Sequence, residues 1–190
     1  MPLQKITKEE LLQKAAQVIN TQGYKSTSMH DLAKACGLLK GSFYHYFSSK
    51  EILVKEVLSF SLAFFREHVF AKAYQEAYTP EQRLAKMLTL QADIVSQNFQ
   101  GCLFGNLTLE TDHLETEFKE IIRLFFEEWQ SAMAHLWFLK TQDLTSAQQQ
   151  AQLSIAHIEG GILLMKLHRD KEPFNQVLTY INHSFQNAKS

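Results

Sequence analysis

A short run near the N-terminus concentrates side chains that can donate hydrogen bonds. Residues 40–46 read Lys-Gly-Ser-Phe-Tyr-His-Tyr, so a cation, two small residues and several polar rings follow one another. A helix that enters the DNA major groove needs small residues for close approach and donors that face base edges and phosphates. The Lys40 ammonium can donate to guanine O6 or N7, and the ring of Phe43 or Tyr44 can meet a thymine methyl group. This run therefore predicts contacts with double-stranded DNA.

Further donors flank the run. Thr27 and Ser28 are expected at the start of one helix and Lys50 in the first turn of another, where donors can hold a phosphate. The predicted DNA-contacting residues are Thr27, Ser28, Lys40, Gly41, Ser42, Phe43, Tyr44, His45, Tyr46 and Lys50. Because residues 1–57 contain no arginine, we expect modest base recognition, with DNA shape contributing. An aromatic core is the alternative for residues 43–47, and a solvated or core position is the alternative for His45.

The sequence around the run predicts helices that would position these donors. Capping-box patterns, in which Ser or Thr stands three positions before an acidic residue, begin helices at residues 7–10 and 28–31. Glycines at positions 23 and 37 end the apolar periodicity of these two helices. Residues 40–47 form the next helix, and serines 48 and 49 cap a longer one that runs through Leu62. Two short helices joined by a glycine turn and flanked by longer helices describe a helix-turn-helix.

Helical periodicity continues through the rest of the chain, and the alternating runs typical of strands are absent. Plausible breaks predict helices near residues 80–98, 103–111, 114–139, 146–168 and 173–186. We therefore expect an all-α fold of about nine helices. Its parts are an N-terminal three-helix helix-turn-helix domain at residues 1–50 and a larger helical domain at residues 51–190. The helix that begins at residue 48 links them.

Composition and charge limit the classes of protein that fit. The formal net charge of −1 hides an asymmetry, because residues 1–57 carry +3 and the remainder carries −4. The first third is therefore the candidate for binding a polyanion. No apolar run approaches the ~20 residues that span a bilayer, so we expect a cytoplasmic protein with no membrane partner. Cys36 and Cys102 lie far apart, which argues against a disulfide, and Cys36 is expected to be buried.

The DNA-binding signature of one bacterial repressor family is matched by residues 23–53, GYKSTSMHDLAKACGLLKGSFYHYFSSKEIL. This stretch resembles the TetR family, nearly residue for residue from Lys40 to Phe47 and in the following Ser-Lys-Glu. One departure is Leu39, where many members have a Ser or Thr that caps the recognition helix. The resemblance implies a homodimeric repressor, associated with the bacterial nucleoid when it is bound to a palindromic operator. It also implies a C-terminal domain, here residues 51–190, for ligand sensing and dimerisation.

A second segment suggests how such a repressor would be released from DNA. Gly101-Cys102-Leu103 resembles the GCL segment of a TetR branch that responds to electrophiles and oxidants. Cys102 is expected to begin a helix, and the positive end of the helix dipole favours thiolate over thiol. Lys166 matches a lysine of the same branch, and a nearby ammonium would favour the thiolate further. Cys102 and Lys166 are therefore candidate sensor residues, and a small buried hydrophobe is the alternative for Cys102.

A small-molecule inducer is the other expected route of release. A broad apolar stripe at three- and four-residue steps marks the longest expected helix, at Phe118, Ile122, Phe125, Trp129, Met133 and Leu136. Core packing is the default interpretation of this stripe. The resemblance implies that part of it lines a ligand cavity together with neighbouring helices. The candidate pocket residues are Phe65, Met87, Phe99, Phe125, Trp129 and Met133.

The glycine pair at positions 160 and 161 predicts a close helix approach, because each glycine costs a helix roughly 1 kcal/mol relative to alanine. In the family that the chain resembles, the last two helices form a four-helix interface with their symmetry mates. The candidate interface residues are Ile155, Ile158, Gly161, Ile162, Met165, Val177, Ile181 and Phe185. Packing within one chain is the alternative for the same residues.

Motifs of other function classes are missing from the sequence. No H-E-x-x-H, paired CxxC, Gly-rich phosphate loop or nucleophile elbow occurs, so we expect no enzyme, metal site or cofactor. The expected partners are operator DNA, a small-molecule or electrophile inducer, and a second copy of the chain. The alternative function is a helical ligand-binding dimer that does not bind specific DNA sequences.

Overall fold

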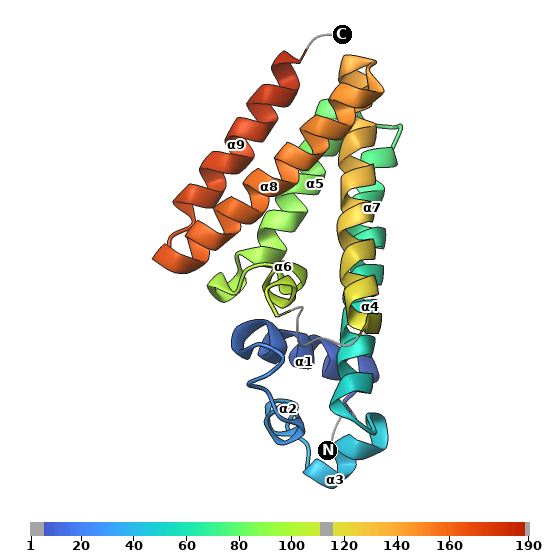
Figure 1. The fold of residues 1–190 in the computed structure, drawn as a ribbon, viewed down its shortest axis with the longest axis vertical. Coiled ribbons are helices and arrows are strands. Elements are labelled where there is room, and N and C mark those ends of the chain that lie inside the picture. The colour runs from blue at the N-terminus through green and yellow to red at the C-terminus, as the bar shows by residue number, and fades with distance from the viewer. Residues whose placement is uncertain (1–5, 111–115, 189–190) are drawn as a thin grey trace. The chain divides into compact units, whose positions relative to one another are not determined.

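The computed structural model describes residues 6–110 and 116–188, which contain nine α-helices, two 3-10 helices and no strand (Figure 1). This confirms the all-α prediction. The α-helices are α1 (Lys8–Gln22), α2 (Met29–Ala35), α3 (Lys40–Tyr46), α4 (Lys50–His68), α5 (Pro80–Val95), α6 (Leu103–Thr108), α7 (Thr116–Thr141), α8 (Leu144–His168) and α9 (Glu172–Asn187). None of these described helices is long and apolar enough to cross a membrane.

The chain divides into two compact units. The first unit combines residues 1–62 with residues 103–122, so it contains α1 to α3, most of α4, α6 and the start of α7. The second unit combines residues 63–102 with residues 123–190 and contains α5, most of α7, α8 and α9. The unit that holds the helix-turn-helix thus extends beyond residue 50 and includes a segment from the middle of the chain.

Capping explains where the first two helices begin. The Thr7 hydroxyl accepts from the Glu10 backbone N–H at 3.1 Å, and the Glu10 carboxylate accepts from the Thr7 N–H at 2.8 Å. Ser28 and Asp31 form the same reciprocal box at the start of α2. Each cap stabilises its helix by about 1 kcal/mol. Gly23 ends α1 with a φ of +81°, a conformation that side chains other than glycine rarely adopt.

Apolar side chains from α3, α4 and the turn between them form part of the core of the first unit. Phe43 of α3 and Phe47 just after it are completely buried, with ring centroids 5.4 Å apart. Leu53 and Val57 of α4 are also completely buried. Ser49 begins α4 by accepting the Ile52 N–H at 3.2 Å, so the serine cap expected here lies at the second of the two serines.

Several helix ends in the second half of the chain differ from the sequence expectation. The helix expected to begin at residue 146 begins at Leu144, because the Asp143 carboxylate accepts from the backbone N–H groups of Thr145 and Ser146. The helix expected near 103–111 ends at Thr108, and the one expected to reach residue 98 ends at Val95. Two 3-10 helices, η1 (Phe70–Tyr74) and η2 (Gln97–Phe99), follow α4 and α5, where i→i+3 bonds tighten the chain. Residues 114 and 115 lie outside the described residues.

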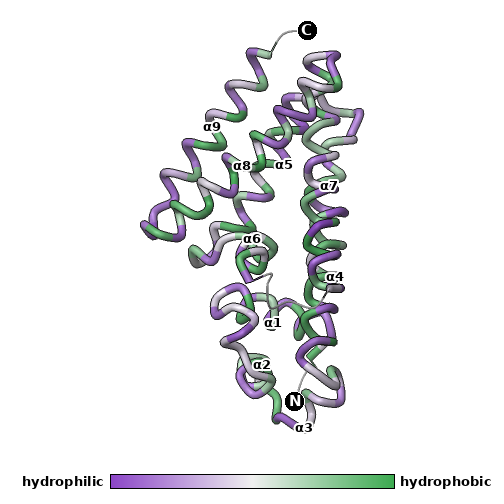
Figure 2. The backbone as a smooth tube through the Cα atoms, viewed as in Figure 1, coloured by the Kyte–Doolittle hydropathy of each residue, from purple (hydrophilic) through white to green (hydrophobic). Residues whose placement is uncertain are grey.

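Close packing of α8 against α9 dominates the second unit, and the two helices lie side by side in Figure 1. Gly161 makes this possible, because a Cβ there would lie 3.0 Å from a Val177 methyl group and 3.3 Å from the Phe174 Cα. Hydrophobic and hydrophilic residues alternate along α9 in Figure 2, as expected for a helix with one buried face. The Trp137 ring of α7 packs edge-on against Phe185, with centroids 5.0 Å apart.

Candidate functional site

The exposed face of α3 carries most of the predicted DNA contacts. Lys40, Gly41, Ser42, Tyr44 and His45 are exposed, and Tyr46 is half-buried. The face therefore combines an ammonium, a hydroxyl, a phenol and an imidazole with a glycine that leaves room for close approach. These are the groups that a recognition helix uses on base edges and phosphates. Their contact with DNA stays a prediction.

Two of the predicted contacts are wrong as side-chain contacts in this structure. Phe43 is completely buried, and its ring packs against Phe47 inside the first unit. Thr27 is 2% exposed, and its hydroxyl donates to the Gly23 carbonyl at 2.7 Å. Neither group is available to a phosphate or a base. The spacing of Phe43 and Phe47, one helical turn apart, is the signal that could have assigned Phe43 to the core.

The other two flanking donors already have partners in the protein. The Ser28 hydroxyl donates to the Asp31 carboxylate at 2.6 Å and accepts the Asp31 N–H at 3.2 Å, and its hydrogen bonds lower the pKa of Asp31. The Lys50 ammonium lies 4.1 Å from the centroid of the Tyr24 ring, and desolvation lowers its pKa. Ser28 and Lys50 are both partly exposed. Each can therefore contact a phosphate while it also keeps its present partner in the protein.

The turn between α1 and α2 is held by a residue that the sequence did not single out. Glu110, which follows α6, accepts from the backbone N–H groups of Tyr24 and Lys25 at 3.0 and 3.1 Å. Asn106 of α6 donates to the Asn20 side chain at 2.6 Å. No local pattern could have revealed the Glu110 contacts, because 85 and 86 residues separate the partners. The segment from α6 to Glu110 therefore positions the helix-turn-helix within the first unit.

Tyr24 connects the same turn to two other helices of the first unit. Its ring packs edge-on against Phe118 of α7, with centroids 5.7 Å apart. Its hydroxyl donates to the Glu51 carboxylate of α4 at 3.4 Å, and the pKa of Glu51 is lowered mainly by hydrogen bonds at the start of that helix. The turn before α2 is thus in contact with α4, α7 and the end of α6.

The candidate sensor cysteine is almost completely buried in the second unit, with 5% of its surface exposed. Its thiol forms a hydrogen bond with the carboxyl group of Glu159 on α8. Burial raises the pKa of Glu159, and the bond to Cys102 lowers it by less. Lys166 lies on the exposed side of α8. Cys36 is 3% exposed, as expected for a structural cysteine, and burial raises the pKa of its thiol.

The candidate pocket residues form part of the core of the second unit. Phe125 packs against Phe65 and Trp129, with ring centroids 5.2 and 5.9 Å away. Met87 and Met133 are completely buried. The exception is Phe99, which is half-buried and lies 5.9 Å from the Arg169 guanidinium.

Three buried polar atoms of the second unit have no hydrogen-bond partner among the described residues. They are Gln91 Oε1 on α5, Trp129 Nε1 on α7 and Glu159 Oε1 on α8. Buried polar groups are nearly always hydrogen-bonded, so each orphaned atom calls for an explanation.

The residues predicted for the dimer interface mostly face the interior of one chain. Ile158, Gly161, Ile162, Met165, Ile181 and Phe185 are buried in the single chain, while Ile155 and Val177 are half-buried. Burial of these six favours the alternative, packing within one chain, and the close approach at Gly161 is made to α9 of the same chain. Their contact with a second copy stays a prediction. The apolar surface that α8 exposes is a different stripe, formed by Leu153, Gly160, Leu163, Leu164 and Leu167.

Comparisons with known proteins match two regions of the chain. Residues 11–57 match the family described as bacterial regulatory proteins of the tetR family. Residues 80–180 match the C-terminal domain described as transcriptional regulator LmrA/YxaF-like. The first match contains the helix-turn-helix, and the second contains α5 to α8 and half of α9.

Similar proteins cover nearly the whole chain. The HTH-type transcriptional repressor DhaR of Mycobacterium sp. (strain GP1) is 28% identical over 92% of this chain and 89% of its own. A TetR transcriptional regulator from Legionella pneumophila has the same fold, with a TM-score of 0.86 and 23% identity over 97% of this chain and 99% of its own. The reduced form of E. coli NemR gives a TM-score of 0.76 at 22% identity, over 91% and 93% of the two chains. The chain belongs to the TetR family of bacterial regulatory proteins.

Proposed function

We propose that this regulator is a homodimeric repressor that binds a palindromic operator and releases it when a small molecule occupies the second unit. The observation that carries the proposal is the exposed donor face of α3, with Lys40, Ser42, Tyr44 and His45 on a helix whose opposite side is anchored by Phe43. The similar DhaR is named a repressor, which supports repression over activation.

The exposed stripe of α8 supports dimerisation. Leu153, Gly160, Leu163 and Leu167 recur at steps of seven, three and four residues and so share one face of the helix. Beyond the adjoining residues and backbone of α8, no atom of the described residues lies within 4 Å of the Cβ position of Gly160, so a second helix can approach there. A two-fold dimer presents two copies of α3, which suits two half-sites about 34–36 Å apart.

The inducer site is supported by two of the orphaned polar atoms. The Glu81–Lys140 ion pair, at 2.7 Å, joins the start of α5 to the end of α7. The two helices run in opposite directions in Figure 1. Gln91 lies ten residues after Glu81, and Trp129 lies eleven residues before Lys140. At a rise of about 1.5 Å per residue, the two side chains lie at a similar level on the two helices. A ligand with a donor for Gln91 Oε1 and an acceptor for Trp129 Nε1 would satisfy both atoms.

Release would be transmitted by chain segments that pass from one unit into the other. Residue 102 ends one segment of the second unit, and Glu110 lies only eight residues further on, beyond α6. A ligand that moves residues 96–102 would therefore pull on α6 and on the Glu110 bonds to the turn before α2. Helix α4 also continues from the first unit into the second, and its swing would misalign the two recognition helices.

The proposal is tested by selection of binding sites from random duplex DNA. We expect the wild type to enrich a palindrome and the Tyr44→Ala variant to lose that enrichment. Tyr78→Ala, which removes an exposed tyrosine of the second unit, is the matched control and should retain it. No enrichment by the wild type would overturn the proposal and favour the alternative, a helical ligand-binding dimer without specific DNA binding.

A further inference from the structure

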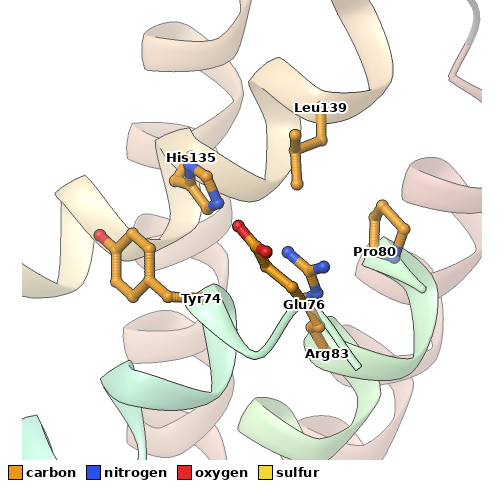
Figure 3. A pocket seen from close by; sticks show the side chains of 6 residues that line it. All are labelled: Tyr74, Glu76, Pro80, Arg83, His135 and Leu139. Carbon is orange, nitrogen blue, oxygen red and sulfur yellow. The ribbon is translucent and has the colours of Figure 1, made fainter. Parts of the chain in front are cut away.

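A separate cavity of about 340 Å³ lies among η1, α5 and α7 in the second unit. Its lining, drawn in Figure 3, consists of Tyr74, Glu76, Pro80, Arg83, His135 and Leu139. None of these residues is among the candidate pocket residues or the orphaned polar atoms described above. Small-molecule sites combine such apolar walls with a few polar groups that converge on the ligand.

Arg83 supplies a buried cation at this cavity. Only 8% of the residue is exposed, and its Nε donates to the Tyr78 carbonyl at 2.7 Å, which fixes the guanidinium plane. No hydrogen bond of its terminal NH₂ groups occurs within the described parts of the chain, and the guanidinium faces the cavity in Figure 3. Since a guanidinium stays charged at every accessible pH, a buried one with open donors favours an anionic partner.

An anion already faces the same space. The Glu76 carboxylate points into the cavity in Figure 3, but within residues 6–110 and 116–188 it forms no ion pair with Arg83. The charge of the nearby Lys140 is neutralised by Glu81, whose Oε1 lies 2.7 Å from the Lys140 Nζ. Burial lowers the pKa of His135 and Arg83 lowers it further, whereas Glu76 raises it, so the imidazole is neutral at pH 7. The cavity therefore offers one positive and one negative group that do not neutralise each other by direct contact.

The walls of the cavity add apolar surface beside these charges. The Tyr74 and His135 rings are in contact, with centroids 4.7 Å apart and planes tilted by 30°. Pro80 and Leu139 supply aliphatic surface. A ligand that fits must therefore carry opposite charges a few bonds apart and also an apolar portion.

We propose that this cavity binds a small zwitterion of the amino-acid type. The ligand carboxylate accepts a forked pair of hydrogen bonds from Arg83, and its ammonium donates to Glu76. Its apolar side chain packs against Pro80 and Leu139. The site goes beyond the proposed function, because it requires neither operator DNA nor the inducer site at Gln91 and Trp129.

The test is to screen the twenty L-amino acids at 10 mM for thermal stabilisation of the full chain and to measure the affinity of the best one by calorimetry. Arg83→Lys keeps the charge but loses the fork, so binding should weaken by about tenfold or more. Glu76→Gln should weaken binding of the amino acid to a similar extent. It should not weaken binding of the matched carboxylic acid that lacks the amine, because that compound has no ammonium group to pair with Glu76.

Glu67→Gln is the control variant, because it removes an exposed carboxylate of the same unit from outside the cavity and should bind as the wild type does. Circular dichroism shows whether Arg83→Lys is folded, and Glu76→Gln supplies the decisive comparison if it is not. Two results would overturn the proposal: no amino acid stabilises the protein, or Glu76→Gln binds the amino acid as tightly as the wild type. Since the measurement contains no DNA, it can fail while the repressor proposal stands.

Discussion

The Glu110 carboxylate lies so close to Gly23 that a Cβ on the glycine would be 2.7 Å from Glu110 Oε1. The same carboxylate accepts from the next two backbone N–H groups, of Tyr24 and Lys25. Glu110, which follows α6, can therefore bind the turn before α2 only because residue 23 has no side chain. This contact makes the helix-turn-helix dependent on a segment that follows residue 102 of the second unit along the chain.

Gly23→Ala is expected to destabilise the protein more than Gly37→Ala. Both glycines have a positive φ, +81° and +72°, so an alanine is strained at either position, and the ψ of 163° at Gly23 lies in a region that is essentially restricted to glycine. The alanine at residue 23 also meets Glu110, whereas within residues 6–110 and 116–188 the Cβ position at Gly37 has nothing within 4 Å except its chain neighbours. Urea unfolding of the two variants measures the difference, and equal losses of stability would show that the Glu110 contact contributes nothing.

Glu110→Gln is expected to weaken operator binding by about tenfold. The glutamine amide has one oxygen that can accept from the N–H of Tyr24 or Lys25, but its NH₂ group faces the other N–H and cannot accept from it. That backbone donor is left unsatisfied, which costs about 1–3 kcal/mol. The turn before α2 would then be less well held, although no DNA-facing residue has changed. Fluorescence anisotropy with the selected operator measures the effect. Glu120→Gln, an exposed carboxylate on α7, is the control and should leave the affinity unchanged.

Glu159 should make the pH dependence of stability differ between the wild type and Glu159→Gln. Burial raises the pKa of this carboxyl above its ordinary value of 4.5, so the folded state binds its proton more tightly than the unfolded state. Below pH 4.5 the group is protonated in both states and costs nothing. As the pH rises through the folded pKa, the wild type loses stability, by about 1.4 kcal/mol for each unit of separation.

Subtracting the two unfolding free energies between pH 4 and pH 8 isolates this group. The carboxyls of Asp31, Glu51 and Glu81 have lowered pKa values and so stabilise the fold as the pH rises, but they are present in both proteins. The advantage of Glu159→Gln should grow with pH. If the difference in unfolding free energy did not change with pH, burial would not disfavour the ionised form of Glu159.

Cys102 is expected to react slowly with thiol reagents in the native protein. It is 5% exposed, and its thiol is engaged with Glu159 rather than open to solvent. Labelling in buffer should be at least about tenfold slower than in urea, with Cys36→Ser used to follow Cys102 alone. Release of the operator by N-ethylmaleimide that is lost in Cys102→Ser would instead establish cysteine modification as the route of induction.

The local features of the fold could be predicted from the sequence because their causes are local. Thr7 and Ser28 stand three residues before their acidic partners, so the starts of α1 and α2 follow from the capping box alone. The start of α8 was missed by two residues because Asp143 caps it without that pattern. Phe43 is predicted to contact DNA because its ring can meet a thymine methyl group, but in the structure it packs against Phe47 in the core.

Contacts between distant segments could not be predicted, because no periodicity encodes them. The Glu110 bonds join residues 85 and 86 positions apart. The cavity at Arg83 likewise requires η1, which the sequence did not predict. At Gly161 a close helix approach was expected, but one sequence cannot say whether the approaching helix belongs to the same chain or to a partner. The contact with Val177 of α9 answers that question.

Leu163→Glu combined with Leu167→Glu should convert the protein to monomers. These residues are 60% and 70% exposed and lie one turn apart on the apolar stripe of α8, so the two carboxylates would be buried without partners in a dimer. Light scattering after size exclusion measures the mass, which should fall from twice the 21.9 kDa of the chain to that value. Leu144→Glu is the control, because Leu144 is 61% exposed but lies at the start of α8 on the other side of the helix. If the double variant stays dimeric, the stripe is not the interface, and the two α3 helices must be brought together by another surface.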